Sequence, residues 1–520
     1  MAFLTAAQAK DRGDILALID ERRSVTWSEL DSRVNQLVNA LRDRGLTAGD
    51  TVAVVAGNQC EWFEIAQACA HGGWTYVPVN WHWVADELAY VFDDADAVAV
   101  FVDRRFEDAV GAALADERSK RVRVVVGIGA ASRDDRSIEY EDLLATASSE
   151  EPADQLLGGP MFYTSGTTGR PKGVRGMLSG GGALTPDIMQ LIGASFSNFL
   201  PIPGRTMLCG PFYHSAQWAF SFLPMVGGSS VVMQHKYDSA EMLRLIDQHA
   251  CTNVHLVPTQ MKRLLDLSDQ VKSSFDGSSL TAVWHGAAPC PPAVKRGLID
   301  WWGPKITEYY GSTEGSIIST ITSQEWLDKG GSVGKPLGTV EVIVVDDAGS
   351  RVSPGQEGTL YFRNLMGSDF TYHNDEAKTK DAHLEPGVFT TGDVGYIDAA
   401  GYLWLSDRKI DMIISGGVNI YPAEIEGVLA SHPSVEDVAV IGVPDEEFGE
   451  SVKAVVQLAE GVAPSDDLAA ALIAHCRASL AGYKAPRSVD FIASIPRTGT
   501  GKIQKQPLRA PYWEGRSRRI

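Results

Sequence analysis

Short apolar runs rich in valine and isoleucine alternate with amphipathic segments through the first three-quarters of the chain. The segment 240–249, for example, places Met242, Leu243, Leu245 and Ile246 on roughly one helical face. Continuously apolar strands separated by helices are typical of parallel sheets that are buried on both faces. The pattern therefore predicts an α/β architecture, with strands over 51–56, 97–102, 122–128, 229–233, 253–257 and 280–284.

The pattern changes at two later points, and a chain of 520 residues exceeds the ~250–300 residues at which one core stops growing. From about residue 340, a strand, turn and strand predict an antiparallel or barrel-like section over 340–363. A second change falls near 407–411. The elements expected beyond it are helices over 422–430 and 466–480 and strands over 435–441, 451–456 and 489–492.

These last residues, about 110 in a mixed α+β pattern, suffice for a small separate domain. We expect a large N-terminal domain of layered α/β subdomains over 1–407 and a small α+β C-terminal domain over 408–520.

Charge and cysteine content narrow the class of protein. The formal net charge of −20 argues against a general role on nucleic acid or on an anionic membrane. No apolar stretch approaches the ~18–20 residues that span a bilayer, and the N-terminal residues do not resemble a signal peptide. The six cysteines are scattered, without a C-x-x-C pair, which favours reduced thiols. We expect a cytoplasmic enzyme.

The strongest local signal lies at 163–174, which reads Tyr-Thr-Ser-Gly-Thr-Thr-Gly-Arg-Pro-Lys-Gly-Val. Glycines let backbone N–H groups approach a phosphate, hydroxyls donate further hydrogen bonds, and lysine adds a compact positive charge. We interpret the segment as a phosphate-binding loop. Its candidate residues are Thr164, Ser165, Gly166, Thr167, Thr168, Gly169 and Lys172.

A Walker A loop is the obvious alternative, and the spacing excludes it. Arg170 and Pro171 separate the last glycine from Lys172, and Gly173 stands where that motif has Ser or Thr. The second Gly-Lys pair, at Lys502, also fails because Pro496 occupies the first glycine position. A P-loop kinase is therefore excluded.

The loop resembles the phosphate loop of the adenylate-forming superfamily, which contains acyl-CoA synthetases, nonribosomal-peptide adenylation domains and beetle luciferases. Other motifs similar to that family's follow in the expected order between residues 163 and 503. The segments 284–289 and 309–315 resemble those that sandwich adenine, which implies that Tyr310 stacks on the base. The implied nucleotide-binding residues are Gly286, Ala287, Ala288, Pro289, Tyr309, Tyr310, Gly311, Ser312 and Thr313.

The resemblance also implies the polar contacts of ATP. Thr313 would face the α-phosphate and Glu314, with Thr167, would hold Mg²⁺, since a hard cation on phosphate oxygens needs oxygen ligands. The segment 390–395 implies that Asp393 binds the ribose hydroxyls, and Arg408 matches a ribose-contacting arginine at the domain junction.

The C-terminal segments also resemble those of this family, which implies a reaction in two steps. In the first, an acid carboxylate attacks the α-phosphorus of ATP; it is already ionised at pH 7, so the task is electrostatic. Lys172 and Lys502, the latter in the loop 497–503, would neutralise charge.

In the second step a CoA thiol attacks the acyl-AMP after the C-terminal domain has swung. The implied CoA-channel residues are Ser415, Gly416, Gly417 and Phe448. The pivot departs from the family pattern, because Ile410 stands where relatives have Asp or Lys.

The acid is expected to be hydrophobic: fatty, cyclic or aromatic. Amino-acid-activating relatives carry F-D-x-S where this chain has 212–215, and Tyr213 replaces the aspartate that pairs with an ammonium group. His214 is a further catalytic candidate, as a gate or acid-binding residue. The candidate acyl-pocket residues are Tyr213, His214, Trp218, Trp284 and Gly286.

Other readings remain open. We expect CoA as the acceptor, because no L-G-G-x-S carrier segment is fused to the chain, but an acyl-AMP ligase that loads a separate carrier protein is an alternative. A luciferase-like oxygenase is a more distant one. A catalytically silent ATP sensor would need erosion at Lys172, Glu314, Asp393 or Lys502, and none is eroded. The sequence leaves open whether the enzyme is a homodimer.

Overall fold

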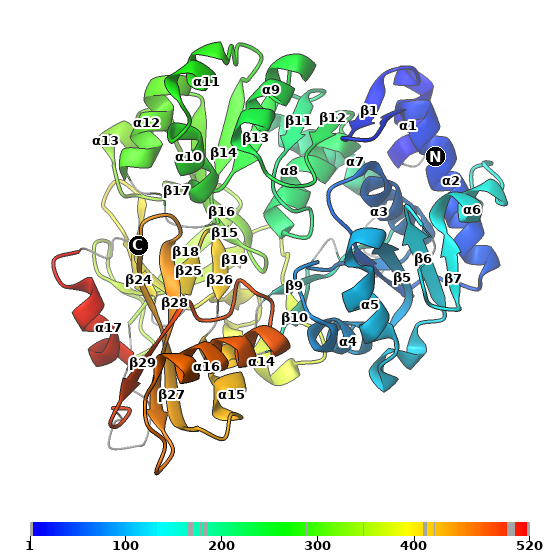
Figure 1. Cartoon of the computed structure of the whole chain (residues 1–520). Helices are drawn as coiled ribbons and strands as arrows, with labels where there is room; N and C mark the ends of the chain where they lie inside the picture. Colours follow the sequence, from blue (N-terminus) through cyan, green and yellow to red (C-terminus); the bar gives the residue numbers. More distant parts are fainter. Residues whose placement is uncertain are drawn as a thin grey trace.

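The computed structural model describes residues 4–130, 132–164, 170–176, 179, 186–287, 290, 292–346, 348–408, 413–420, 422–496 and 505–516. Figure 1 shows that the elements before residue 400 form the larger part of the molecule. The orange and red C-terminal elements lie together against one side of it.

The first layered unit is a six-stranded parallel sheet in the order β7-β6-β5-β3-β4-β8. Its central strands are apolar at nearly every position because helices cover both faces. One of those helices, α3, is buried along its whole length. The strands are β3 (Thr51–Val55), β4 (Thr75–Pro78), β5 (Ala97–Asp103), β6 (Val124–Ile128), β7 (Ser137–Glu139) and β8 (Gly159–Pro160). The helices are α2 (Trp27–Asp43), α3 (Cys60–Gly72), α4 (Ala85–Asp94), α5 (Glu107–Leu114) and α6 (Tyr140–Ala145).

The second unit is a nine-stranded sheet in the order β17-β16-β15-β14-β13-β11-β12-β1-β2. Its middle strands are parallel, and β2, β16 and β17 run antiparallel at the two edges. The strands are β1 (Leu16–Ile19), β2 (Ser24–Thr26), β11 (Arg205–Leu208), β12 (Ser230–Met233), β13 (Asn253–Leu256), β14 (Ala282–His285), β15 (Ile306–Ser312), β16 (Ser316–Thr322) and β17 (Lys335–Pro336).

Helices surround this second sheet at the top of Figure 1. The helix α9 begins at the side-chain cap Asp238 and buries Met242, Leu243, Leu245 and Ile246, which are the four residues expected on one face. The helices are α1 (Leu4–Arg12), α7 (Pro186–Ser195), α8 (Ser215–Val226), α9 (Ser239–His249), α10 (Pro258–Leu265), α11 (Asp269–Ser274), α12 (Pro292–Trp302) and α13 (Ser323–Asp328).

The section expected to be antiparallel or barrel-like is an antiparallel sheet in the order β21-β22-β19-β23-β24, with β18 also paired to β19. A smaller three-stranded sheet, β20-β10-β9, lies between the larger units. The strands are β9 (Phe162–Thr164), β10 (Lys172–Arg175), β18 (Val340–Val345), β19 (Gly358–Asn364), β20 (Thr371–Tyr372), β21 (His383–Glu385), β22 (Val388–Phe389), β23 (Asp393–Ile397) and β24 (Leu403–Arg408); α14 (Glu376–Ala382) follows β20.

The C-terminal unit has a five-stranded sheet in the order β26-β25-β28-β27, with β29 parallel to β28. Its apolar core lies between this sheet and the helices α15 and α16. Its strands are β25 (Ile413–Ser415), β26 (Val418–Ile420), β27 (Val435–Asp445), β28 (Gly449–Leu458) and β29 (Ser488–Ile492). Its helices are α15 (Pro422–Ala430), α16 (Asp466–Ser479) and α17 (Lys505–Trp513).

The predicted fold class is confirmed: a large α/β N-terminal part is followed by a small α+β unit. Most predicted strands differ from the observed ones by one or two residues at their ends. The exception is β27, which continues to residue 445 where the expected strand ends at 441, and which forms a long hairpin with β28 over 435–458. Among the described residues, no helix combines the length and hydrophobicity that crossing a membrane requires.

Candidate functional site

A cavity of about 1890 Å³ opens beyond the carboxyl ends of β11, β13 and β15. The segments that follow these strands supply much of its lining, among them 210–220, 257–263 and 311–314. In parallel α/β sheets, ligands bind at this edge because adjacent strand ends leave a crevice there. The residue Ala287, after β14, also lines the cavity and has a positive φ of 66°. Strained backbone of this kind persists mainly at functional sites.

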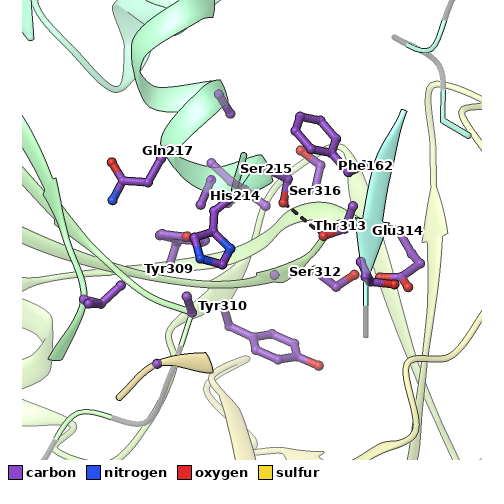
Figure 2. Close-up of a pocket in the computed structure, with 18 of the residues that line it drawn as sticks. Phe162, His214, Ser215, Gln217, Tyr309, Tyr310, Ser312, Thr313, Glu314 and Ser316 are labelled. Carbon is purple, nitrogen blue, oxygen red and sulfur yellow. Dashed lines mark hydrogen bonds between the residues drawn. The ribbon is translucent and has the colours of Figure 1, made fainter. Parts of the chain in front are cut away.

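His214 and Ser215 lie at the start of α8 and face the cavity (Figure 2). The surrounding protein and the nearby His82 lower the pKa of His214 to about 4, so the imidazole is uncharged at pH 7. Ser215 Oγ lies 3.0 Å from Thr313 Oγ1, which joins α8 to the segment after β15. The predicted residues His214 and Thr313 are thus brought to one end of the cavity.

The adjacent Glu314 also lines the cavity. Its Oε1 accepts a hydrogen bond of 3.1 Å from the Tyr372 hydroxyl. Burial raises the pKa of this carboxyl, with nearby Asp393 adding to the rise. Burial makes the charged form of a carboxylate unfavourable, and a bound cation stabilises that charged form. Within the described part of the chain no three His, Cys, Asp or Glu side chains cluster as a protein-only metal site.

Tyr310 and Asp393 come from sequence positions 83 residues apart and meet at the cavity. The Tyr310 hydroxyl donates to Asp393 Oδ2 at 2.6 Å, and the Thr391 hydroxyl donates to the same oxygen at 2.8 Å. Asp393 begins β23 and pairs in register with Arg408 of β24. The structure therefore places the expected adenine-stacking and ribose-binding residues side by side.

Lys172 begins β10, where it pairs in register with Thr164 of β9. Its Nζ lies 3.2 Å from Asp375 Oδ2, and its side chain is only 9% exposed. The pKa of neighbouring Lys378 is lowered to about 8, by burial first and then by Lys172. Asp375 and Lys378 line the cavity, while Lys172 lies directly behind Asp375. Two lysines beside one carboxylate make this end of the cavity suited to an anionic ligand.

Aromatic side chains form the wall near α8. The ring of Phe220 lies 5.3 Å from that of Trp284 and 5.5 Å from that of Tyr309. Trp284 donates its indole N–H to the Phe199 carbonyl, and Trp218 donates its own to the Tyr76 hydroxyl. With their only polar groups paired, both tryptophans present apolar surface. Tyr213, Trp218 and Phe220 line the cavity, whereas Trp284 lies behind Phe220.

A buried polar chain of three residues adjoins this wall and also lines the cavity. Gln217 Nε2 lies 2.9 Å from His255 Nδ1, and His255 Nε2 lies 3.1 Å from the Tyr309 hydroxyl. Burial lowers the pKa of His255 to about 3, so the ring is neutral. The Gln217 amide nitrogen can only donate, so His255 Nδ1 is the acceptor and His255 Nε2 carries the proton. A side chain at Gly286 would meet the Tyr309 ring at 2.5 Å, which explains the glycine there.

The turn between β25 and β26 also reaches the cavity. Gly416 and Gly417 have φ values of 58° and 80°, which glycine adopts without strain. Both line the cavity together with Phe448, and Ser415 pairs with Val418 next to the turn. Cβ positions built on the two glycines would lie 3.7 Å from Thr259 and 3.5 Å from Val257. The hairpin therefore lies against the N-terminal part.

Several predicted site residues lie outside the described residues: Ser165, Gly166, Thr167, Thr168, Gly169, Ala288, Pro289, Ile410 and Lys502; for Arg408 only the backbone is described. Six further residues that line the cavity were not among the predicted ones: Ser215, Gln217, His255, Tyr372, Asp375 and Lys378. Their positions in the sequence carry no local motif, and only the Ser215 neighbourhood, next to His214, offered a signal.

Comparisons with known proteins agree with this arrangement. The AMP-binding enzyme family matches residues 5–366, and the AMP-binding enzyme C-terminal domain matches residues 424–502. A feruloyl-CoA synthase from Amycolatopsis sp is 34% identical over 94% of this chain and 94% of its own length. A 3-oxocholest-4-en-26-oate–CoA ligase from Rhodococcus rhodochrous is 33% identical over 94% and 91%.

Among solved structures, an amide bond synthetase from Marinactinospora thermotolerans superposes with a TM-score of 0.86. It is 28% identical and covers 98% of this chain and 99% of its own. Fold, motif order and the family matches agree over nearly the whole length. The chain therefore belongs to the AMP-binding enzyme family, within the adenylate-forming superfamily, as an enzyme related to acid–CoA ligases.

Proposed function

We propose that this enzyme activates a hydrophobic carboxylic acid as acyl-AMP, releasing pyrophosphate, and then transfers the acyl group to CoA. The observation that supports the proposal most is the composition of one cavity. One part of its lining, Tyr310, Asp393 and Glu314, suits a nucleotide, and another part, the glycine hairpin at 416–417, suits a thin thiol arm.

In the first step, a carboxylate oxygen of the acid attacks the α-phosphorus of ATP. A bond forms between that oxygen and phosphorus, and the α–β phosphoanhydride bond breaks to release pyrophosphate. No proton need move, because the acid is ionised at pH 7. Lys172, Thr164 and Lys502 would stabilise the charge on phosphoryl oxygens, which is the main requirement of such a transfer.

Magnesium fits the residues at the phosphate end. A Mg²⁺ ion that arrives on a triphosphate needs only one or two protein carboxylates, with phosphates and water completing its shell. Glu314 supplies one such carboxylate, with its pKa already raised by burial. Together with Thr167 it would hold the ion, which when bound offsets phosphate charge.

In the second step, the sulfur of CoA attacks the acyl carbon, the thiol proton leaves, and AMP departs with the bonding electrons of the acyl–oxygen bond. The cavity, which Phe448 and the hairpin line together, gives the thiol arm a path to the carbonyl. Uncharged His214 lies where it can accept a hydrogen bond or a proton. The expected domain division, 1–407 and 408–520, and a swing between the steps belong to this proposal.

The acid is expected to be apolar. The wall of Trp218, Phe220 and Tyr309 offers aromatic surface, and the neutral His214 offers no positive charge to a second carboxylate. Tyr213 carries no charge to pair with an amino group. Relatives named for feruloyl and steroid acids have the same family fold, which supports an aromatic, cyclic or fatty acid without choosing among them.

Pyrophosphate release over a panel of acids, with and without CoA, tests the proposal. We expect release with an aromatic, a steroid or a fatty acid but not with α-amino acids, and CoA-dependent AMP formation with the same acid. Acyl-AMP that accumulates with CoA and is consumed by a carrier protein would favour the carrier-loading alternative. Nucleotide binding without release for every acid would favour a silent sensor and contradict the proposal.

A further inference from the structure

One short segment of the C-terminal unit, 480–485, packs into two cores. Ala481 is fully buried in the core cluster of the first layered unit, which also contains Trp83. Leu480 and Ala485 are buried in the core of the C-terminal unit. The Tyr483 ring packs against both clusters, and its hydroxyl accepts a hydrogen bond of 3.0 Å from Asn80. This segment therefore forms a joint between the two parts of the molecule.

A buried ionic cluster lies in this joint. Lys484 Nζ lies 2.7 Å from Glu87 Oε1 of α4 and 2.6 Å from Glu424 Oε1 of α15. The lysine side chain is 1% exposed and each carboxylate 6%. The second oxygen of Glu87 accepts hydrogen bonds from the backbone N–H groups of Ala481 and Val84. One lysine thus bridges a carboxylate from each part.

The two carboxylates belong to different parts of the molecule, and their bonds to Lys484 therefore depend differently on docking. Glu424 belongs to the same unit as Lys484, so this pair can persist whatever the orientation of the unit. Glu87 belongs to the N-terminal part, so its bond to Lys484 exists only while the two parts are docked as observed. Buried pairs with both charges satisfied are strongly orienting, because a misplaced partner leaves an uncompensated charge in a dry interface.

The same docking places the glycine hairpin against Val257 and Thr259. It also brings Glu447 within 2.8 Å of Arg263 on α10. The hairpin is the thiol end of the cavity, so the orientation that Glu87 and Lys484 hold is the one that completes a path for the thiol.

We propose that Lys484 and Glu87 are positioning residues for the thioester step: their bond holds the C-terminal unit in the orientation in which the hairpin at 416–417 lines the cavity. This inference rests on the proposed two-step function. Neither residue is among those that line the cavity. Acyl-AMP formation does not require their bond, and thiol transfer does.

The test uses Glu87→Gln in the full chain. Glutamine keeps a carbonyl oxygen for the backbone N–H groups of Val84 and Ala481, so helix α4 keeps its cap while the interface loses one charge. The matched control is Glu447→Gln, which breaks an ion pair across the same interface whose side chains are 43% and 55% exposed. Exposed pairs contribute little.

We expect Glu87→Gln to slow single-turnover thioester formation from acyl-AMP and CoA about tenfold, and to leave acid-dependent ATP–pyrophosphate exchange within about twofold. Glu447→Gln should leave both rates nearly unchanged. Equal losses in both steps, or no loss in either, would overturn the inference. Thioester formation by the unaltered enzyme is measured first, so that failure of the proposed function is recognised separately.

A second measurement needs no activity. Backbone hydrogen exchange at Ala481, whose N–H donates to Glu87, should rise in Glu87→Gln and not in Glu447→Gln if the bond holds the docked orientation. Unchanged exchange at residues 481–485 would contradict the inference, whatever the kinetics show.

Discussion

Two nearly buried lysines of this enzyme have opposite surroundings. Lys172 lies behind the cavity wall with one carboxylate partner, Asp375, which is 35% exposed. Lys484 lies in the joint between the two parts, with two carboxylate partners that are each 6% exposed. An anionic ligand that enters the cavity can displace or share the Asp375 contact. The Lys484 charge is already fully compensated by the protein.

A lysine side chain therefore has two different roles in this enzyme. A lysine with a weak, partly hydrated partner remains available for a substrate charge, as phosphoryl transfer requires. A lysine enclosed by two carboxylates fixes the position of secondary structure, because breaking either contact leaves a buried charge. The comparison can be tested at each of these residues.

The largest effect is expected for Lys172→Ala. Losing one preorganised charge at a phosphoryl-transfer site lowers the rate about 10²–10³-fold, and acid-dependent pyrophosphate release measures the loss. The folded state should be nearly unaffected, since Asp375 reaches water. Lys262→Ala, which removes a lysine from an exposed helical pair, is the control. A loss below about tenfold would mean that Lys172 is structural, like Lys484.

Lys484→Met should act on stability instead. It leaves Glu87 and Glu424 facing each other without a cation, which we expect to lower the free energy of unfolding by about 3 kcal/mol at pH 8. The loss should shrink at pH 5, which lies below the raised pKa of the Glu424 carboxyl. Urea unfolding at the two pH values measures it. Lys453→Met, at a pair whose aspartate is 39% exposed, should lose about 1 kcal/mol or less; equal losses would contradict the comparison.

The joint should also respond to pH through Glu424. Burial raises the pKa of its carboxyl from 4.5 to about 7, partly offset by Lys484 and reinforced by Glu87. The protonated form is thus favoured in the docked state, so this contribution is fully present below the ordinary pKa of 4.5 and is lost as the pH rises from there through 7. The rings of Trp83 and Tyr483, whose centroids lie 5.9 and 6.0 Å from Lys484 Nζ, carry no charge, since burial raises the pKa of Tyr483.

Glu424→Gln removes this titration. The ratio of thioester-formation rates, unaltered enzyme to variant, should fall about fivefold between pH 6 and pH 8. Taking the ratio cancels the ionisation of the CoA thiol, which is common to both proteins. A ratio that stays constant across this range would show that Glu424 does not titrate in the docked state.

The smallest effect is expected for Asp375→Asn. Asparagine can still accept the hydrogen bond from the Lys378 backbone N–H that caps α14, and Lys172 loses only a partly hydrated partner. Pyrophosphate release should change less than about threefold. A loss as large as that of Lys172→Ala would mean that Asp375 orients the lysine and that the contact is not replaceable.

Much of the fold was accessible from the sequence. The apolar runs at 51–56 and 253–257 are strands because continuous apolar segments between helices are typical of a sheet that is buried on both faces. The observed bounds of these strands differ from the predicted ones by one residue. The hairpin over 435–458 is longer than the strands predicted there. Its polar ends pair with each other, and a hydrophobic pattern does not indicate such pairing.

The sequence by itself predicted the chemistry of the site, since a glycine-rich loop with Lys172, a tyrosine at 310 and carboxylates at 314 and 393 form the set expected to bind a nucleotide. Only the tertiary structure decided which of these groups meet, such as the Tyr310 hydroxyl with Asp393, and which lysine is committed to the joint. Glu87, Glu424 and Lys484 carry no local signal in the sequence. Their role arises from distance and burial, which the chain acquires only when residues 397 positions apart come into contact.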